Sequence, residues 1–377
     1  MGLTSVTLSD FRNYESKTFE FSNGVTVIAG ENAKGKTNLL EAIYLLSTTK
    51  SLRAATEDEL IEKRKEFARI EGFLVDDPPA SGETELLVII GREIKEVSFK
   101  KKVMVNGIGR RVTDFIGNLP AVIFYPSDIN MVTGPPSLRR WHLDLSLAQA
   151  DQHYKKALTA YEQFLTARNR ILKRIREGQG RVNELDYWTK GLVEQGQIVA
   201  NKRKAFFEFI NFSQHPLGEF KFKYTQSEIS IERLIQTNGR EVAAAATLIG
   251  PHRDDFRVIL SETKDINKLD SSPSAQNDKN GRDLAHYGSR GEQRTATLAF
   301  KLAQLEYMAA SLGKRPILLL DDVFSELDAN HRAHVVEIVG KQQTVIATVE
   351  LENIPKDFLD SARIIRIEDG EIAETST

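Results

Sequence analysis

The chain has 377 residues, of which 41% are hydrophobic and 28% charged, a composition that indicates a folded protein and excludes an intrinsically disordered one. Its 51 basic and 53 acidic residues give a net charge of −2, which excludes a protein that is basic overall but not a basic surface on a neutral chain. It contains no cysteine, so disulfide bonds, thiolate catalysis and cysteine-based zinc sites are excluded. We expect a cytoplasmic protein, because the first residues lack a secretory signal pattern and no apolar run approaches the ~20 residues of a membrane span.

The N-terminal third reads as strands around one helix. Strands are predicted over residues 3–8, 17–21 and 25–29, with Asn23-Gly24 as a turn. The apolar spacing over 36–46 predicts a helix. Residues 68–112 are predicted to be β-structure, with strands over 85–90 and 96–105 and a hairpin at Asn106-Gly107.

The middle of the chain changes character. Two long helices are predicted over 138–176 and 184–212, split at Gly178-Gln179-Gly180, which indicates an inserted helical lobe. Short strands are expected to return over 218–260, followed by a polar loop over 270–282. A helix is then predicted over 292–311, and buried strands over 316–320, 344–347 and 364–367.

The segment GENAKGKT at residues 30–37 fits the phosphate-binding pattern G-x-x-x-x-G-K-[S/T], with a predicted strand before it and a helix after it. Backbone N–H groups of 33–37 would hold the α and β phosphates of a nucleotide at the helix N-terminus. Lys36 would reach the β and γ phosphates, and Thr37 would bind Mg²⁺. The alternative is a glycine-containing turn with a solvated lysine. The nucleotide-binding candidates here are Gly30, Glu31, Asn32, Ala33, Lys34, Gly35, Lys36, Thr37 and Asn38.

The apolar segment ILLL at 317–320 ends in two carboxylates, as a Walker B strand does. Asp321 would hold a Mg²⁺-bound water, and Asp322 is the candidate base that orients or deprotonates the attacking water. The alternative is an acidic strand end that caps a turn. Lys36 and Asp321 are 285 positions apart, so a large insertion is expected to separate two halves of one nucleotide-binding fold. The predicted catalytic residues are Lys36, Asp321 and Asp322.

A third motif, Ser289-Arg290-Gly291-Glu292, stands where the predicted helix before the Walker B strand begins. A hydroxyl, free N–H groups and the positive end of the helix dipole suit an anion there. The spacing of 32 residues to Asp321 is typical of the signature motif of ATP-binding-cassette ATPases, which closes over the γ-phosphate bound by a second subunit. An ordinary helix N-cap is the alternative. Ser289, Gly291 and Glu292 are the candidates, and residues 325–328 (SELD) match the D-loop that follows Walker B.

With these residues in view, the chain resembles the RecF family, bacterial recombinational-repair ATPases of the SMC/Rad50-like cassette group. The matching segments include FRNY at 11–14, GKTNLLEAIYLLS at 35–47, KSLR at 50–53, LRRWHLD at 138–144, GPHRDD at 250–255, SRGEQRT at 289–295 and LLLDDVFSELD at 318–328. The chain departs from the family at Ala33-Lys34, where a glycine-rich step is common. The loop 270–282 looks like an insertion, and Thr348 stands near the position of the switch histidine of transporters, which the family lacks.

The resemblance implies an α/β fold, an ABC-type P-loop ATPase head with an inserted α-helical lobe. It divides the chain into a first half of the head (1–125), a helical lobe (126–235) and a second half of the head (236–377). It also places Arg12 and Asn13 at the nucleotide. The implied activity is weak, DNA-stimulated ATP hydrolysis with ATP and Mg²⁺ as cofactors, in a homodimer that forms with ATP and clamps double-stranded and gapped DNA. The implied partners are RecR, RecO and RecA, in recombinational repair, replication restart and the SOS response.

Basic residues gather in three groups that could contact DNA phosphates without reading sequence. The alternative for each group is a solvated helix face. His252 and Arg253 are open to two interpretations, a corner between strand and loop or a position near the phosphates or the dimer interface. The groups are Lys100, Lys101, Lys102, Arg110 and Arg111 near the hairpin; Arg168, Arg170, Lys173, Arg174 and Arg176 on a lobe helix; and Lys202, Arg203 and Lys204.

Two other functions remain open alternatives. The nucleotide subunit of a membrane transporter is disfavoured by the Asp321-Asp322 pair, by GPHRDD and by the size and charge of the inserted lobe. An ATP-binding scaffold that does not hydrolyse, or another SMC-like ATPase, remains open because Asp322 replaces the glutamate usual in cassette ATPases, and its shorter side chain must reach the same water.

Overall fold

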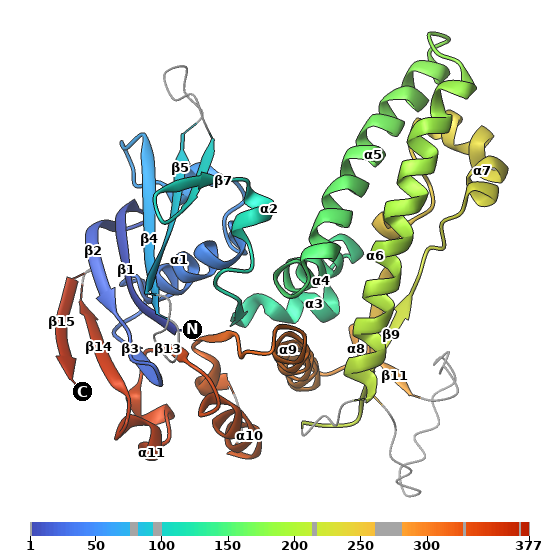
Figure 1. Ribbon diagram of the computed structural model, residues 1–377. Helices are drawn as coiled ribbons and strands as arrows, with labels where there is room; N and C mark the ends of the chain where they lie inside the picture. The colour runs from blue at the N-terminus through green and yellow to red at the C-terminus, as the bar shows by residue number, and fades with distance from the viewer. Residues whose placement is uncertain are drawn as a thin grey trace, which may run out of the picture. The chain divides into compact units, whose positions relative to one another are not determined.

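The computed structural model describes residues 2–75, 82–92, 100–212, 217–260, 281–326, 329–368 and 371–376 (Figure 1). Most of the predicted polar loop 270–282, residues 96–99 of a predicted strand, and Leu327 and Asp328 of the SELD segment lie outside them. The chain forms two compact units, Met1–Ser127 with Met308–Thr377, and Asp128–Tyr307. Within the described residues, no helix is both long and apolar enough to cross a membrane.

The first unit contains the sheet that carries the Walker motifs. Its strand order is β15(Glu371–Ser376)-β14(Arg363–Glu368)-β3(Val25–Ala29)-β13(Thr344–Thr348)-β12(Ile317–Asp321)-β8(Ala121–Phe124). All neighbours pair in parallel except β14 and β15. Every residue of β3, β12 and β13 is buried, which explains why their sequences are mostly apolar and do not alternate with charged residues. The parallel strands bring the ends of β3 and β12 to one edge, although they are far apart in the sequence.

A second, antiparallel sheet completes this unit, in the order β2(Tyr14–Glu20)-β1(Gly2–Phe11)-β4(Phe67–Val75)-β5(Glu83–Gly91)-β6(Lys101–Val105)-β7(Ile108–Arg110). The helix α1(Lys36–Thr48) contacts strands of both sheets and lies between them (Figure 1). It is buried along most of its length. The first turn of α1 is therefore fixed from both sides. Shorter helical segments are η1(Glu57–Leu60), α2(Val112–Phe115), η5(Val323–Glu326), α10(Ala329–Val339), η6(Leu351–Asn353) and α11(Lys356–Leu359).

The second unit is a helical arm with a small sheet. Helices α5(Gln152–Arg176) and α6(Asp186–Phe212) run side by side as its longest pair (Figure 1). The sheet has the order β11(Arg282–Asp283)-β10(Asp255–Leu260)-β9(Phe220–Thr225), all antiparallel. The remaining elements are η2(Pro126–Ile129), which begins in the first unit, α3(Asn130–Thr133), α4(Pro136–Ala150), η3(Val182–Leu185), α7(Ile231–Ala244), η4(Pro251–Arg253), α8(Leu284–Tyr287) and α9(Arg290–Leu312), which continues into the first unit.

Two predictions for the arm need correction: the single helix over 138–176 is two helices, and the segment 218–260 contains a helix between its expected strands, β9 and β10. The helix predicted over 138–176 is broken at Asp151, whose backbone is extended and whose side chain accepts hydrogen bonds from the N–H groups of His153 and Tyr154. This N-cap ends α4 and begins α5. The strands predicted over 218–260 surround a helix, α7, which begins at a second N-cap where the Ser230 hydroxyl accepts from the N–H of Arg233.

The domain boundary also differs from the predicted one, which begins the second half of the head at 236. In the structure, the arm unit instead extends from Asp128 to Tyr307, so residues 236–307 belong to it. Pairing between β9 and β10 joins Phe222 to Val258, so a division at 236 would cut this sheet. The ring of Phe256 in β10 stacks on Phe300 of α9 at 5.1 Å, which binds the first part of α9 to the same core.

Candidate functional site

The loop between β3 and α1 has the backbone shape that a phosphate-binding loop needs. Gly35 has φ +111, and a Cβ atom built there would lie only 2.5 Å from the Tyr14 hydroxyl and 2.7 Å from Asn13 Nδ2. Only glycine fits both the conformation and the space. Ala33 also has a positive φ, +65, at the position where the sequence departs from the family.

Lys36 is buried at the centre of this loop. Its ammonium group donates hydrogen bonds of 2.7 Å to the carbonyl oxygens of Gly30 and Glu31. Burial lowers the pKa of Lys36, while the nearby charges of Asp321 and Asp322 oppose that shift. The loop therefore holds a desolvated cation where the sequence predicts contact with phosphates.

Thr37 and Asp321 meet across the gap in the sequence. The Thr37 hydroxyl lies 2.9 and 3.0 Å from the two carboxylate oxygens of Asp321, at the end of β12. Burial raises the pKa of Asp321 to about 6, against the hydrogen bond from Thr37 and the charges of Arg53 and Lys36, which lower it. The predicted pair of magnesium ligands is thus brought together, and a divalent cation would relieve the cost of burying this carboxylate.

Asp322 follows in a left-handed conformation with φ +51. Its N–H donates to the carbonyl of Ala347 in β13 at 2.9 Å, and its carbonyl accepts from the Ser325 hydroxyl. A non-glycine residue held at positive φ is uncommon, and such strained positions cluster at functional sites. The conformation fits the role predicted for this side chain.

Arg12, Asn13 and Asn38 belong to a hydrogen-bond network beside the loop. These residues are predicted from the sequence to lie at the nucleotide, but the contacts between them are not. Asn38 donates to Asn13 at 2.8 Å and accepts from Arg53 at 3.0 Å. Arg12 makes a two-pronged ion pair with Glu41 at 2.8 and 2.9 Å. Glu41 is 1% exposed and also accepts from Ser51. Its place in the segment 35–47 that resembles the family is a signal in the sequence that could have pointed to it.

Thr348, at the end of β13, does not present a free side chain. It is buried, and its hydroxyl donates to the carbonyl of Glu350 at 3.0 Å. A pocket of about 530 Å³ lies beside the loop, lined by Gly30, Glu31, Lys34, Leu351, Arg366 and Glu368, among others. This volume falls within the range of small-molecule sites.

The signature segment forms a reciprocal helix cap. The Ser289 hydroxyl accepts from the N–H of Glu292 at 3.3 Å, and the Glu292 carboxylate accepts from the N–H of Ser289 at 2.7 Å. Arg282 also contacts this carboxylate. Although partial burial opposes it, the hydrogen bonds from Ser289 and the charge of Arg282 lower the pKa of Glu292. The N-cap interpretation holds, and Glu292 is occupied within its own unit, while Ser289 and Gly291 are exposed.

The helix that follows buries polar side chains at helical spacing. Lys301 pairs with Asp128 at 3.2 Å, with both side chains 4% exposed. His142 is buried nearby on α4, and burial together with the charge of Lys301 lowers its pKa to about 3. The start of the arm and the signature helix are therefore joined by buried ionisable groups.

His142 should make the stability of the arm fall as the pH falls. An unfolded chain takes up a proton at the ordinary histidine pKa of 6.5, whereas the folded chain does not until about 3. Stability is thus full above 6.5 and is lost as the pH drops towards 3, by about 2 kcal/mol between pH 7.5 and pH 5. Urea unfolding at the two pH values should show this loss, and the variant His142→Gln should lose correspondingly less. An identical loss in both proteins would contradict the assignment.

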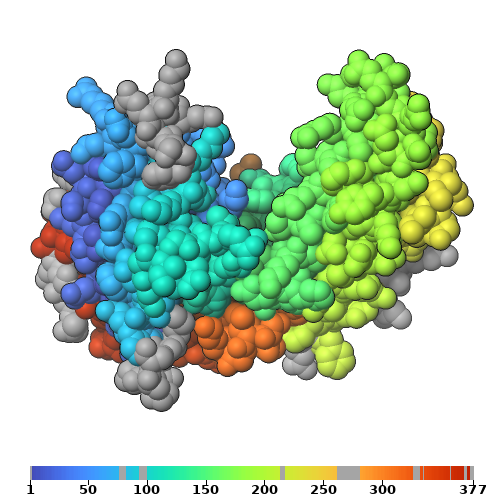
Figure 2. Space-filling model, turned by 45° about the horizontal axis from the view of Figure 1, so that its top comes forward, coloured from blue at the N-terminus to red at the C-terminus, as the bar shows by residue number. Residues whose placement is uncertain are grey.

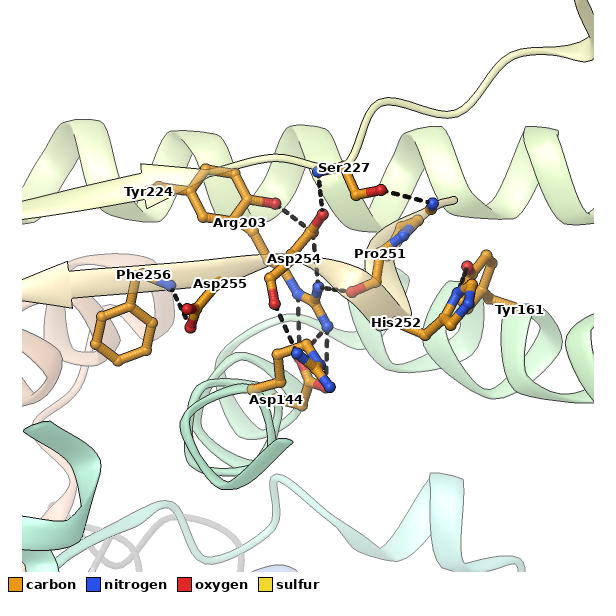
Figure 3. Close-up of polar contacts among 12 residues, drawn as sticks. Asp144, Tyr161, Arg203, Tyr224, Ser227, Pro251, His252, Asp254, Asp255 and Phe256 are labelled. Atoms are coloured by element: carbon orange, nitrogen blue, oxygen red, sulfur yellow. Dashed lines mark hydrogen bonds and ion pairs between the residues drawn. The ribbon is translucent and has the colours of Figure 1, made fainter. Parts of the chain in front are cut away.

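Two arginines predicted within DNA-binding groups are buried instead. Arg168 and Arg203 are each 1% exposed. Arg168 pairs with Glu241 at 2.8 Å and donates to Thr247 and Thr189. Arg203 pairs with Asp144 and Asp254, each at 2.8 Å, and donates to the carbonyl of Pro251 (Figure 3). These contacts correct the prediction, because neither guanidinium faces solvent.

The GPHRDD segment supplies partners to this buried network. The Asp254 carboxylate accepts from Arg203, from the Tyr224 hydroxyl and from the N–H of Ser227 (Figure 3). His252 lies 2.6 Å from the Tyr161 hydroxyl and 3.0 Å from the carbonyl of Thr247, and burial lowers its pKa. Of the two interpretations of His252, the structure supports the corner that fixes strand and loop.

One of the basic residues predicted near the hairpin to contact DNA is not available for it. Lys101 points inward, where its ammonium donates to the carbonyl of Thr49 at 2.6 Å and contacts Glu57, and burial lowers its pKa. This corrects its prediction as a DNA contact. Lys100, Lys102, Arg110 and Arg111 are exposed around the hairpin, with Arg111 paired to Asp114 at 2.9 Å.

Comparisons with known proteins agree with this geometry. A family model described as the RecF/RecN/SMC N-terminal domain matches residues 2–363. Proteins described as DNA replication and repair protein RecF, from Geobacillus kaustophilus (strain HTA426) and Staphylococcus aureus (strain JH9), are 33% and 34% identical. The alignments cover 100% and 99% of this chain and 100% of each relative.

Solved structures are similar over the same length. One described as the recombination mediator protein RecF-ATPrS in the RecFOR pathway is 28% identical, with a TM-score of 0.82 over 100% of this chain and 98% of that chain. A Smc head domain from Pyrococcus furiosus is 16% identical, with a TM-score of 0.52 over 99% of this chain and 95% of that chain, which supports the fold alone. The predicted α/β ATPase head with an inserted helical lobe is confirmed.

Proposed function

The chain belongs to the RecF family, within the wider group that carries the RecF/RecN/SMC N-terminal domain, and on this premise we propose that it is an ATP-dependent DNA-binding protein of recombinational repair and replication. The observation that carries the proposal is the meeting of Lys36, Thr37 and Asp321 at one sheet edge. Relatives described as DNA replication and repair proteins, and a solved structure described as RecF-ATP in the RecFOR pathway, support it.

The residues fit ATP with Mg²⁺. The Lys36 ammonium donates to two carbonyl groups of the loop, and the same N–H groups would donate to the β and γ phosphates when ATP is bound. Thr37 and Asp321 offer a hydroxyl and a carboxylate, the oxygen ligands that Mg²⁺ takes from a protein when phosphates complete its shell. When bound, the ion would neutralise charge on the phosphates. Arg12 and Asn13 would flank the nucleotide from the β1–β2 turn.

We assign slow hydrolysis to Asp322. Its backbone is held at the end of β12 by Ala347 and Ser325, and from this position its carboxylate would orient the attacking water. The side chain is one methylene shorter than glutamate. A scaffold that binds ATP without hydrolysing it remains the second candidate for that reason, and a wild type that binds ATP without releasing phosphate would favour it. Unchanged turnover in Asp322→Asn would instead remove the role assigned to Asp322.

The signature segment supports dimerisation with ATP. Gly291 lies in the first turn of α9, and a Cβ atom built there meets nothing within 4 Å. Nothing within the described chain therefore requires a glycine, although glycine is among the weakest helix formers. A close approach by another molecule would explain it. We infer that Ser289 and Gly291 close over the γ-phosphate held by the loop of a second copy.

The exposed cations that remain would contact DNA phosphates. On the arm these are Arg170, Lys173, Arg174 and Arg176, of which Arg174 pairs with Glu184. Around the hairpin they are Lys100, Lys102, Arg110 and Arg111. We propose that the dimer holds double-stranded or gapped DNA, with DNA-stimulated hydrolysis, and aids the loading of RecA together with RecO and RecR.

Affinity for duplex DNA, measured with ATP, should fall steeply as salt rises. Each phosphate contact contributes a slope of about −0.9 in log affinity against log salt. The triple variant Arg170→Ala, Lys173→Ala and Arg176→Ala should make the slope shallower by about 2 to 3 if all three bind phosphates. Lys356→Ala, an exposed lysine at the start of α11, serves as the control and should change little. A flat salt dependence, or the same slope in the triple variant, would count against the proposal.

A further inference from the structure

The tip of the arm carries an apolar groove that the proposed function does not use. It forms where η3 and the start of α6 face α7, which lies on the two long helices (yellow on green in Figure 2). Its volume is about 280 Å³. The apolar lining consists of Val182, Leu185, Ile231, Leu234 and Ile235.

Three of these side chains are unusually exposed for their type. Val182, Ile231 and Ile235 are 51%, 43% and 69% exposed. Ile231 and Ile235 are one helical turn apart, so they share a face of α7. Clustered exposed aliphatic side chains rimmed by polar residues mark binding surfaces more often than singly scattered ones do.

The floor of the groove is firmly held. Leu185 is buried among Ile171 and Leu172 of α5, and Leu234 among Tyr161 and Leu192. The buried ion pair of Arg168 with Glu241 ties α5 to α7 beneath it. Because the groove is already formed in the free protein, little conformational entropy of the arm would be lost when a partner binds.

The surroundings of the groove are basic, although its lining includes Asp186 beside Lys190. Residues 168–190 and 228–244 carry nine basic and six acidic side chains, a net charge of +3. Within the described part of the chain, three of these cations have no ion-pair partner and are not among the proposed DNA contacts: Arg181, Lys190 and Arg240. A partner that covers the groove is therefore favoured if it is acidic.

We propose that this groove binds an acidic amphipathic helix of a partner protein, an interaction beyond ATP and DNA binding. The groove is smaller than most small-molecule sites, and it suits two or three aliphatic side chains from successive turns of a helix. Acidic residues on the flanks of that helix would face Arg181, Lys190 and Arg240, which leaves the exposed cations of α5 to DNA. DNA is the weaker candidate, because its phosphates would leave the apolar lining in water.

The test titrates the full chain into a fluorescein-labelled peptide of about 18 residues, with leucines at positions i, i+3, i+4 and i+7 and glutamates elsewhere. Saturable binding is expected. Ile235→Asp and Lys190→Glu should each weaken it about 10-fold or more, which corresponds to 1.4 kcal/mol. Phe212→Asp is the matched control, since Phe212 is 95% exposed at the far end of α6. Val182→Asp replaces Ile235→Asp if that variant does not fold, as judged by its thermal melt.

Three results would overturn the proposal. The first is no saturable binding by the wild type. The second is equal binding of a peptide of the same composition with scrambled leucine spacing, because attraction would then be electrostatic alone. The third is a loss of duplex DNA affinity in Ile235→Asp as large as the loss of peptide affinity, which would assign the groove to DNA.

Discussion

Replacing Lys36 with arginine should lower ATP turnover at least about 100-fold, the size of effect expected when one preorganised donor to the reacting phosphates is lost. The ammonium is a compact charge held by two carbonyls of its own loop at 2.7 Å. A planar guanidinium keeps the charge but cannot occupy that position with the same geometry. Steady-state release of phosphate, with and without duplex DNA, is the measurement.

Lys34→Ala is the matched control for this variant. Lys34 lies two residues earlier in the same loop, is part-exposed and is only 3.9 Å from the carboxylate of Glu31. It should alter turnover far less than Lys36→Arg does. Unchanged turnover in Lys36→Arg would remove the assigned role of Lys36.

Replacing Arg203 with alanine should destabilise the arm by about 3–5 kcal/mol, the cost of leaving buried charges without a partner. The variant removes the ion pairs of Arg203 with Asp144 and Asp254 and the hydrogen bond that it donates to the carbonyl of Pro251. Those groups belong to α4, to η4 and to the residue between η4 and β10, so the packing of these elements on one another would loosen. Chemical denaturation of the two proteins measures the difference.

Lys204→Ala on the same helix is the control. Lys204 is exposed and pairs with Glu208 at 3.9 Å, a contact worth about 0.3–0.5 kcal/mol. If Arg203→Ala folded with full stability and lost only DNA affinity, Arg203 would be a DNA contact after all. The buried position of its side chain argues for the opposite result.

The nucleotide site was largely predictable because its chemistry is local in sequence. The loop around Lys36 and the strand ending at Asp321 each carry their own pattern, and parallel pairing brings them together. The resemblance to the RecF family is confirmed by relatives that match along the whole chain. Glu41 was missed because its role depends on Arg12 and Ser51, which α1 meets only in the folded unit.

The arm was harder to predict for a physical reason. A run of basic residues does not reveal which charges are paired. The partner of Arg168, Glu241, lies 73 positions later in the sequence, and one partner of Arg203, Asp254, lies 51 positions later. Helix α7 lies between β9 and β10 in the sequence, although these two strands pair with each other in the sheet. The prediction of short strands over 218–260 therefore covered the helix as well. The signature helix was placed correctly, but its packing on Phe256 assigns its first part to the arm.

The most direct test of the central claim is sedimentation of the chain with and without ATP. The wild type should be a monomer alone and a dimer with ATP, and Ser289→Arg should bind ATP yet stay a monomer. Gly291→Ala, which meets open space in the free chain, should keep its thermal stability and dimerise less well. A wild type that stays monomeric with ATP, or a Ser289→Arg variant that dimerises normally, would contradict ATP-driven closure of two copies.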